Sequence, residues 1–230
     1  MTPEIKKLLG RSWIFSDLSV RELDALAALA RVKALRPKEH VVKKGDAGGP
    51  IFAVLRGRLK VITPGVGHDA AFNIMGPGEL FGEIAAFDGQ GRSASVSALE
   101  PCELAVIDPR DFAAFLDRNP PVSRKLLTVL ARRVRNLSER VEDRAFLDVA
   151  ARLAKCLVGL SDRYGKDVPE GRAVALRLSQ QELGELVDAT RESVNKLLRG
   201  WQKQGIVSHA ANAFVVHRPD ALRAVAQGRP

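Results

Sequence analysis

The sequence predicts an α+β protein of two domains joined by a long helix, and three observations support this prediction. Short β-rich runs alternate with glycine turns over residues 32–108, which is typical of an all-β sandwich or barrel. Apolar residues at heptad spacing follow over residues 127–141, as in a two-stranded coiled coil. Residues 178–207 then have the pattern of two short helices separated by a tight turn.

The length and composition of the chain agree with two folded domains. Its 230 residues exceed one typical domain, so we predict a first domain at residues 1–118, the long helix at 119–145 and a second domain at 146–230. Hydrophobic residues make up 46% and charged residues 27% of the chain. These fractions are ordinary for a globular protein and exclude a disordered chain, a collagen-like repeat and a disulfide scaffold.

The net charge indicates where a polyanionic partner would bind. The chain carries +9, to which residues 1–118 contribute +1 and residues 119–145 and 146–230 contribute +4 each. The second half is therefore expected to face nucleic acid. A solvated basic surface would have the same net charge, so the charge alone leaves both readings open.

The remaining composition favours a cytoplasmic protein. Cys102 and Cys156 lie far apart in the chain, which favours reduced thiols over a disulfide, and two cysteines cannot supply a four-cysteine iron–sulfur site or a zinc finger. The N-terminus lacks an apolar signal region, and stretches such as Ile51–Leu55 are too short to span a bilayer. We therefore predict no membrane contact and no metal site.

The first domain is predicted to begin with helix and continue as strands. Within the first thirty residues, leucines recur at roughly helical spacing beside the capping residues Asp17 and Ser19. Glycine turns separate most of the β-rich runs that follow. The predicted strands are Glu39–Lys43, Ile51–Leu55, Arg58–Ile62, Ala70–Met75, Ala94–Leu99 and Glu103–Ile107.

Asn119–Pro120–Pro121 marks the start of the long helix. Its apolar residues recur three or four positions apart, with charged residues on the flanks; they are Leu127, Leu130, Val134, Leu137 and Val141. These residues form a narrow apolar stripe along one side of the helix, which we call the seam. Because such a narrow seam is typical of two-stranded coiled coils, we predict a parallel homodimer. The alternative is a helix that packs only on its own domain.

The second domain contains the most specific pattern in the chain. After a helix from about Phe146, Ser179 and Glu182 form a Ser-x-x-Glu capping box that starts a further helix. Asp188–Ala189–Thr190 makes a short turn, and Thr190 can cap the next helix. Two short helices joined in this way predict a helix-turn-helix.

The second of these helices has side chains suited to the major groove of DNA. Val194, Leu197, Leu198 and Trp201 form its apolar stripe, and the polar side chains point elsewhere. Arg191 can donate a bidentate pair of hydrogen bonds to guanine, Glu192 can accept one from cytosine, and Lys196 can reach another guanine or a thymine. The predicted DNA-contacting residues are Ser179, Gln181, Thr190, Arg191, Glu192, Asn195, Lys196 and Arg199.

A β-hairpin is expected after this helix. Gly205 ends the helix, and the apolar runs Ile206–Val207 and Phe214–Val216 flank a turn around Asn212. This wing would bring His209, His217 and Arg218 near the DNA backbone. The alternative for the whole unit is a helical hairpin whose charged residues are merely solvated.

A second constellation lies between the predicted strands of the first domain. Gly82 allows close approach to the backbone, and the amides that follow, at Glu83, Ile84 and Ala85, can hold a phosphate. Arg92 and Ser93 offer a guanidinium and a hydroxyl to the same phosphate, and Glu83 can accept from a ribose hydroxyl. Without further support, these residues could equally form a turn and a surface ion pair between Glu83 and Arg92.

Together these motifs resemble the CRP/FNR superfamily of bacterial transcription regulators, and most closely its cyclic-AMP receptor branch. The likeness covers essentially the whole chain, in the same order and spacing. The segments that carry it are Phe81–Gly82–Glu83–Ile84, Arg92–Ser93–Ala94, Ala145–Phe146–Leu147–Asp148 and Thr190–Arg191–Glu192–Ser193–Val194. The resemblance implies a cyclic-nucleotide-binding β-roll (jelly-roll), a dimerisation helix and a C-terminal winged helix-turn-helix.

The resemblance also implies roles for individual residues. Gly82 and Glu83 correspond to the backbone contact and the acceptor for the ribose 2′-hydroxyl, and Arg92 with Ser93 to the clamp on the cyclic phosphate. Leu137 and Ser138 stand where members that bind cAMP commonly carry Thr-Ser against the adenine, so one hydroxyl is missing. Lys196 stands where the receptor usually has arginine, which replaces a bidentate contact by a point charge.

The resulting prediction is a homodimeric DNA-binding transcriptional regulator controlled by a cyclic nucleotide, cAMP or cGMP. Its expected partners are a palindromic operator with TGTGA-like half-sites and RNA polymerase. One alternative is a family member that binds DNA without nucleotide or senses another effector, which Leu137 would favour. A haem sensor is disfavoured because His40 and His68 have no evident partner pattern. An enzyme or kinase-type regulatory subunit is disfavoured by the lack of catalytic motifs and by the recognition helix.

Overall fold

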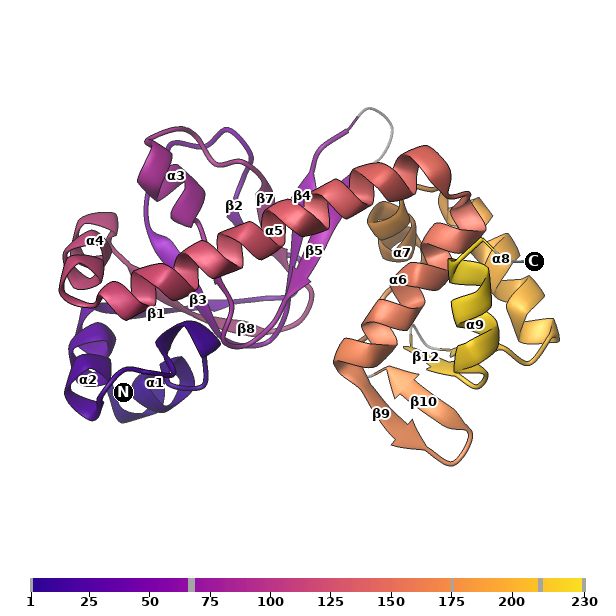
Figure 1. The fold of residues 1–230 in the computed structure, drawn as a ribbon, viewed down its shortest axis with the longest axis horizontal. Helices are drawn as coiled ribbons and strands as arrows, with labels where there is room; N and C mark the ends of the chain where they lie inside the picture. Colours follow the sequence, from indigo (N-terminus) through magenta and orange to yellow (C-terminus); the bar gives the residue numbers. More distant parts are fainter. Residues whose placement is uncertain (1, 66–68, 175, 211–212, 229–230) are drawn as a thin grey trace. The chain divides into compact units, whose positions relative to one another are not determined.

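The structure is a computed structural model that describes residues 2–65, 69–174, 176–210 and 213–228. The chain forms two compact units, residues 1–66 with 72–134 and residues 67–71 with 135–230. Figure 1 shows both units, coloured from the N-terminus to the C-terminus. The division falls inside the long helix, whereas the sequence analysis treated that helix as a segment of its own.

The N-terminal thirty residues are helical, but they form two helices and a 3-10 turn. These are α1 (Thr2–Leu9), the turn Trp13–Phe15 and α2 (Val20–Leu29). Ser19 begins α2 with a capping box, because its hydroxyl accepts from the Glu22 amide at 3.3 Å and the Glu22 carboxylate accepts from the Ser19 amide at 2.7 Å. The predicted cap at Ser19 is confirmed.

Two antiparallel four-stranded sheets follow, in the orders β1-β8-β3-β6 and β2-β7-β4-β5. The strands are β1 (Arg31–Leu35), β2 (His40–Val42), β3 (Ile51–Arg56), β4 (Leu59–Thr63), β5 (Ala70–Met75), β6 (Leu80–Phe81), β7 (Ser95–Ala98) and β8 (Cys102–Ile107). All six predicted strands are confirmed. The sequence analysis missed β1, which is mostly exposed, and β6, which has only two residues.

Strand β3 explains how the first unit is layered. Its first five residues are all buried, and alternate side chains of a strand point to opposite faces. Ile51, Ala53 and Leu55 pack into a core formed with α1, α2, α4 (Pro109–Arg118) and the start of α5. Phe52 and Val54 pack into a second core with residues of the other sheet. Helices therefore cover one face of the β3 sheet and the second sheet covers the other (Figure 1).

The long helix α5 spans Pro120–Phe146, so each end lies within one residue of the predicted segment 119–145. Val122 and Leu126 are buried near its beginning. Farther along, apolar residues of the predicted seam are largely exposed in the single chain; the exposed fractions are 65% for Leu127, 63% for Val134, 51% for Leu137 and 70% for Val141. More than half of the surface of each of these four side chains is therefore exposed in the single chain.

The second unit combines helices with a four-stranded sheet of order β11-β12-β10-β9. Its elements after α5 are α6 (Val149–Tyr164), β9 (Gly165–Val168), β10 (Gly171–Val174), α7 (Gln180–Val187), α8 (Arg191–Lys203), β11 (Val207–Ala210), β12 (Ala213–Val216) and α9 (Pro219–Ala226). The predicted helices and the β11–β12 hairpin are confirmed, although Asn212 lies outside the described residues. The sequence analysis missed the β9–β10 hairpin and α9.

Two smaller predictions can also be checked. Cys102 and Cys156 are both free thiols, as expected. Burial raises the pKa of the Cys156 thiol to about 12, so this group stays protonated at neutral pH. Among the residues that the structure describes, no helix is long and apolar enough to cross a membrane.

Candidate functional site

The first candidate site is built around a glycine turn between β6 and α3 (Glu83–Asp88). Gly82 has φ +87° and immediately precedes the helix. A Cβ at this position would lie 2.6 Å from Nη1 of Arg92 and 3.0 Å from the carbonyl oxygen of Pro50. Both the left-handed backbone and the close approach of Arg92 therefore require glycine.

Arg92 is held beneath this turn with only 5% of its surface exposed. Its guanidinium donates to the carbonyl oxygens of Gly82 at 3.1 Å and Pro50 at 2.8 Å, and lies 5.6 Å from the centre of the Phe52 ring. Burial lowers the pKa of Arg92, while the nearby carboxylates of Asp46 and Glu83 oppose that shift. Since an arginine stays charged at neutral pH, the site contains a fixed cation with further N–H donors available.

Glu83 is even more deeply buried, with 1% of its surface exposed. Its Oε1 accepts a hydrogen bond from Arg133 of α5, which also donates to the carbonyl oxygen of Leu80. Burial raises the pKa of Glu83, although Arg133 and Arg92 partly counteract this. The alternative of a surface ion pair between Glu83 and Arg92 is therefore wrong, because Glu83 is buried and its ion-pair partner is Arg133.

The second carboxylate oxygen of Glu83 shows what kind of group would complete this site. Oε2 is buried and has no hydrogen-bond partner among the described residues. A buried acceptor without a donor is costly, so a ligand hydroxyl placed there would be bound favourably. The hydroxyl groups of a ribose have this donor chemistry, and the buried guanidinium of Arg92 suits an anionic phosphate.

The other predicted ligand residues lie in the first turn of α3, beside Arg92 and on α5. Ile84 and Ala85 form the first turn of α3, where backbone amides lack acceptors within the helix. Ser93 is exposed next to Arg92. Leu137 and Ser138 are exposed residues of α5 that belong to the second unit, so their position beside this pocket stays a prediction.

Arg133 is the residue of this candidate site that sequence reasoning missed. The sequence analysis had treated the basic residues of this helix as the flanks of a coiled-coil seam. Glu83 and Arg133 are 50 residues apart, so no local pattern joins them. One general rule could have pointed to such a residue: a carboxylate that is buried next to a glycine turn needs a cation beside it.

The second candidate site is the helix-turn-helix formed by α7 and α8. The predicted capping box is present, because the Ser179 hydroxyl accepts from the Glu182 amide at 3.2 Å and the Glu182 carboxylate accepts from the Ser179 amide at 2.8 Å. Asp188 ends α7 in a left-handed conformation with φ +53°. Thr190 caps α8 by accepting from the Ser193 amide at 3.2 Å. The predicted helices and turn are confirmed.

Helix α8 divides into apolar and polar faces as predicted. Val194, Leu198 and Trp201 are buried against the rest of the domain, and Leu197 is partly buried. The polar residues proposed for DNA lie outward: Arg191, Glu192, Lys196 and Arg199 are exposed, and Asn195 is partly buried. The outward face therefore presents three cations and one carboxylate.

The remaining predicted DNA contacts lie around this helix. Gln181 and Thr190 are exposed, whereas the Ser179 hydroxyl is engaged in the capping box. In the wing, the His217 ring bonds to the Glu170 carbonyl oxygen at 2.6 Å and to the Ser208 hydroxyl at 2.9 Å. His217 therefore joins the wing to the turn between β9 and β10.

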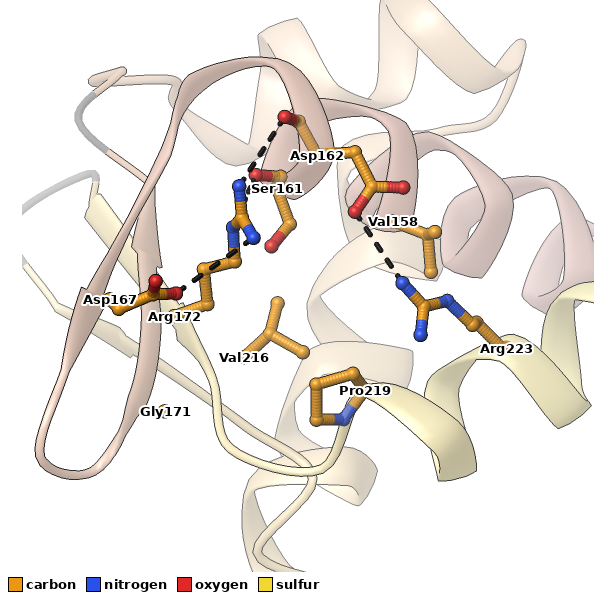
Figure 2. A pocket seen from close by; sticks show the side chains of 9 residues that line it. All are labelled: Val158, Ser161, Asp162, Asp167, Gly171, Arg172, Val216, Pro219 and Arg223. Carbon is orange, nitrogen blue, oxygen red and sulfur yellow. Dashed lines mark hydrogen bonds and ion pairs between the residues drawn. The ribbon is translucent and has the colours of Figure 1, made fainter.

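A further pocket of about 290 Å³ lies on the second unit (Figure 2). Its charged residues face one another, with Asp162 3.5 Å from Arg223 and Asp167 3.8 Å from Arg172. Gly165 beside it must lack a side chain, since a Cβ there would lie 2.2 Å from the Ser161 carbonyl oxygen. The pocket is lined by Val158, Ser161, Asp162, Asp167, Gly171, Arg172, Val216, Pro219 and Arg223, and none of these is a predicted site residue.

Comparison with known proteins identifies the two domains that contain these candidate sites. The family described as a cyclic nucleotide-binding domain matches residues 32–119, and the Crp-like helix-turn-helix domain matches residues 151–225. The CRP-like cAMP-activated global transcriptional regulator of Mycobacterium tuberculosis H37Rv is 32% identical over 206 residues, covering 85% of this chain and 90% of the relative. The chain belongs to the CRP/FNR family. As a member of this family it is a DNA-binding transcriptional regulator with a cyclic nucleotide-binding domain.

Solved structures of CRP/FNR regulators share the fold. A CooA mutant from Carboxydothermus hydrogenoformans has a TM-score of 0.76 at 21% identity, covering 91% of each chain. CLP from Xanthomonas campestris, described as a c-di-GMP responsive global regulator, has a TM-score of 0.75 at 24% identity, covering 86% of this chain and 99% of CLP. The predicted α+β architecture of β-sheet domain, long helix and helix-turn-helix is therefore confirmed.

Proposed function

We propose that this regulator is a homodimer whose affinity for a palindromic operator is set by a cyclic nucleotide, cAMP or cGMP, bound in the first domain. The observation that carries this proposal is the buried pair of groups at the β6–α3 turn. Arg92 is 5% exposed and Glu83 is 1% exposed, and the Oε2 atom of Glu83 lacks a donor among the described residues. The relative from Mycobacterium tuberculosis, described as cAMP-activated, supports the same ligand class.

Each ligand residue has a distinct role in this proposal. A bound cyclic nucleotide supplies ribose hydroxyl donors and an anionic cyclic phosphate. Glu83 accepts from the ribose, while Arg92 and Ser93 donate to the phosphate together with the amides of Ile84 and Ala85. Gly82 keeps the backbone free of a side chain at the point of contact. Leu137 and Ser138 would contact the purine.

The exposed stripe of α5 supports the homodimer. Leu127, Val134 and Val141 are each more than 60% exposed in the single chain. Pairing these residues with the same residues of a second copy would bury them at heptad spacing. Two copies related by a two-fold axis would also place two recognition helices against successive major grooves.

The exposed face of α8 supports sequence-specific binding. Arg191, Glu192 and Lys196 would contact base edges in TGTGA-like half-sites about one helical turn apart, with Asn195 beside them. Ser179, Gln181, Thr190 and Arg199 would contact phosphates. RNA polymerase is the further partner that a transcriptional regulator in the bacterial cytoplasm would engage.

Calorimetry and operator binding test the proposal together. The protein is titrated with cAMP and with cGMP, and its affinity for a palindromic operator is then measured with and without each nucleotide. We expect binding of at least one nucleotide and a change in operator affinity of about five-fold or more. Operator binding that no nucleotide alters would contradict the allosteric part of the proposal.

A second candidate is a regulator of this family that needs no nucleotide or answers another effector. Leu137 favours it, because an apolar side chain stands where a hydroxyl would meet the purine. The c-di-GMP response in the description of CLP shows that at least one protein of this fold is described with a different effector. Calorimetry in which neither cAMP nor cGMP binds would favour this candidate.

We predict that Leu137→Thr strengthens the preference for cAMP over cGMP by up to about ten-fold. The added hydroxyl would restore one neutral hydrogen bond to the adenine, about 0.5–1.5 kcal/mol. Dimer stability should fall slightly, because a polar residue replaces an apolar one in the seam. Titration of both proteins with both nucleotides tests this, and an unchanged ratio would mean that Leu137 does not face the purine.

We predict that Glu192→Ala relaxes base choice at one operator position by about 1–3 kcal/mol. Arg199→Ala is the matched control on the same helix, since it should weaken binding to all sequences alike and reduce the salt slope by about one. Competition between operators that differ at single positions measures both effects. The assignment of α8 as the base-reading helix would be wrong if Glu192→Ala left the base preference intact.

A further inference from the structure

Three arginines converge on the C-terminal end of α7, immediately before the recognition helix. Arg152 of α6 donates to the carbonyl oxygens of Val187 at 3.0 Å and Asp188 at 3.4 Å. It also donates to the carbonyl oxygen of Leu147, between α5 and α6, at 2.8 Å. The last carbonyls of a helix lack partners within the helix and carry partial negative charge. Arg152 therefore stabilises this helix end from within the second domain.

The other two arginines belong to α5. Arg140 donates to the carbonyl oxygen of Leu186 at 2.8 Å, and Arg144 forms an ion pair with the carboxylate of Asp188. All of these residues lie in the second unit. We call the bonds of Arg140 and Arg144 to α7 and its turn the α5 contact. The α5 contact joins the end of the long helix to the turn from which α8 begins.

The α5 contact spans the link between α5 and α6, which is formed by residues 147 and 148. Residues 147 and 148 lie outside both helices, and Asp148 caps α6. Arg152 follows this link, so it keeps its bonds to α7 when α5 changes direction. Arg140 and Arg144 precede the link, so any change in the angle between α5 and α6 must break or remake their bonds.

Asp188 is suited to this connection because of its backbone. It is one of two described non-glycine residues with positive φ, at +53°, a conformation that aspartate tolerates better than most residues. Its carboxylate is used by Arg144 of another helix. The residue that ends α7 therefore also holds α5.

We propose that Arg140 and Arg144 are positioning residues that couple the direction of α5 to the orientation of the recognition helix. This inference rests on the proposed function for its regulatory consequence, because a cyclic nucleotide would act on DNA affinity through α5. The coupling itself requires only the contacts between α5 and the turn. Arg144 gives the cleaner test, because Arg140 also donates to the carbonyl oxygen of Ala71.

Hydrogen exchange on the full-length protein tests the coupling without nucleotide or DNA. The variants are Arg144→Ala, Asp188→Asn, the double variant and Arg144→Lys, which keeps the charge. Arg135→Ala is the matched control, because Arg135 is an exposed arginine of α5 with no ion pair in the described ranges. We expect Arg144→Ala to speed exchange at the amides of residues 188–190 about two- to five-fold, as for loss of a partly exposed ion pair.

The reciprocal effect distinguishes coupling from a local role. Asp188→Asn should speed exchange at residues 140–146 of α5 by a similar factor, since coupling between two sites acts in both directions. The double variant should change exchange no further than either single variant, and Arg144→Lys should restore most of the protection. Effects confined to the mutated element, or a double variant whose effects add, would overturn the proposal.

Operator affinity with and without cAMP separates this proposal from the proposed function. We expect Arg144→Ala to alter the ratio of the two affinities at least two-fold and Arg135→Ala to leave it unchanged. A wild-type protein that shows no response to nucleotide would contradict the proposed function, while the exchange result still decides the coupling. A wild-type response that Arg144→Ala preserves in full would overturn the regulatory role of the α5 contact.

Discussion

Replacing Arg92 with alanine should remove most of the affinity for cyclic nucleotide and also destabilise the first domain. Loss of a charge-assisted hydrogen bond to the phosphate costs about 1.5–3 kcal/mol, roughly ten- to a hundred-fold in affinity. The stability effect follows from the structure, because Arg92 also donates to the carbonyl oxygens of Gly82 and Pro50. From the sequence alone, the same substitution would be expected to leave the fold intact, since those two bonds are not visible there.

The two effects of Arg92→Ala can be separated by choice of variants. Arg92→Lys keeps the cation but loses the planar fork, so we expect an intermediate loss of affinity. Arg31→Ala is the matched control, because it removes an exposed arginine from strand β1 of the same domain. Calorimetry measures the affinity and urea unfolding measures the stability. Nucleotide affinity that Arg92→Ala does not lower, in a protein that remains folded, would rule out Arg92 as the phosphate ligand.

Much of the fold could be predicted from the sequence because its strongest signals are local. Heptad spacing identified α5, the Ser179 capping box identified α7, and glycine turns separated the strands. Several of the missed elements lack such signals. Helix α3 is only six residues long, and two of its apolar side chains, Ile84 and Phe87, are 41% and 49% exposed. Strands β9 and β10 contain charged and glycine residues rather than an apolar alternation.

Helix α4 was missed although its signals were present. Asp108 caps it, Pro109 occupies its first turn, and Phe112, Phe115 and Leu116 are buried on one face. Proline at the first helical position after an aspartate is a typical helix start.

The candidate site was predictable only where its residues are close in sequence. Gly82 and Glu83 are adjacent, and Arg92 follows after the short helix α3 and a loop, so their shared chemistry could be recognised. The partner of Glu83 could not, since Arg133 reaches it from another element. The partnership depends on how α5 packs against the first domain. Tertiary packing therefore determined the ion-pair partner of Glu83, which the alternative to a ligand site had taken to be Arg92.

Arg133→Ala should destabilise the protein by about 3 kcal/mol at neutral pH, because it leaves the buried carboxylate of Glu83 without its ion-pair partner. We expect the lower end of the range for broken buried pairs, since the Arg133 side chain is itself 29% exposed. Glu83→Gln should recover much of this loss in the Arg133→Ala background, because a neutral amide needs no counter-ion. The control variant Arg132→Ala removes the neighbouring arginine, which lies over the Trp13 ring and forms no ion pair with Glu83.

The pH dependence of this loss follows from the direction of the pKa shift. Burial raises the pKa of Glu83 above its ordinary value of 4.5, so the folded protein binds this proton more tightly than the unfolded chain. Protonation of Glu83 therefore contributes to the stability of the folded protein. This contribution is fully present below about pH 4.5 and is lost as the pH rises through the raised pKa. Arg133→Ala removes an interaction that lowers this pKa, so the pKa of Glu83 should be higher in the variant than in the wild type.

The destabilisation by Arg133→Ala should consequently shrink as the pH is lowered from 7 toward 4.5, because Glu83 takes up its proton in both proteins as the pH falls through its raised pKa. Urea unfolding at several pH values measures this difference. The protein concentration is kept constant, because the stability of the proposed dimer would depend on it. The Glu83→Gln pair of proteins, with and without Arg133, should show a much smaller pH dependence over the same range. A destabilisation by Arg133→Ala that is equally large at every pH would mean that Arg133 acts through its bond to Leu80, and that the charge of Glu83 is not what it balances.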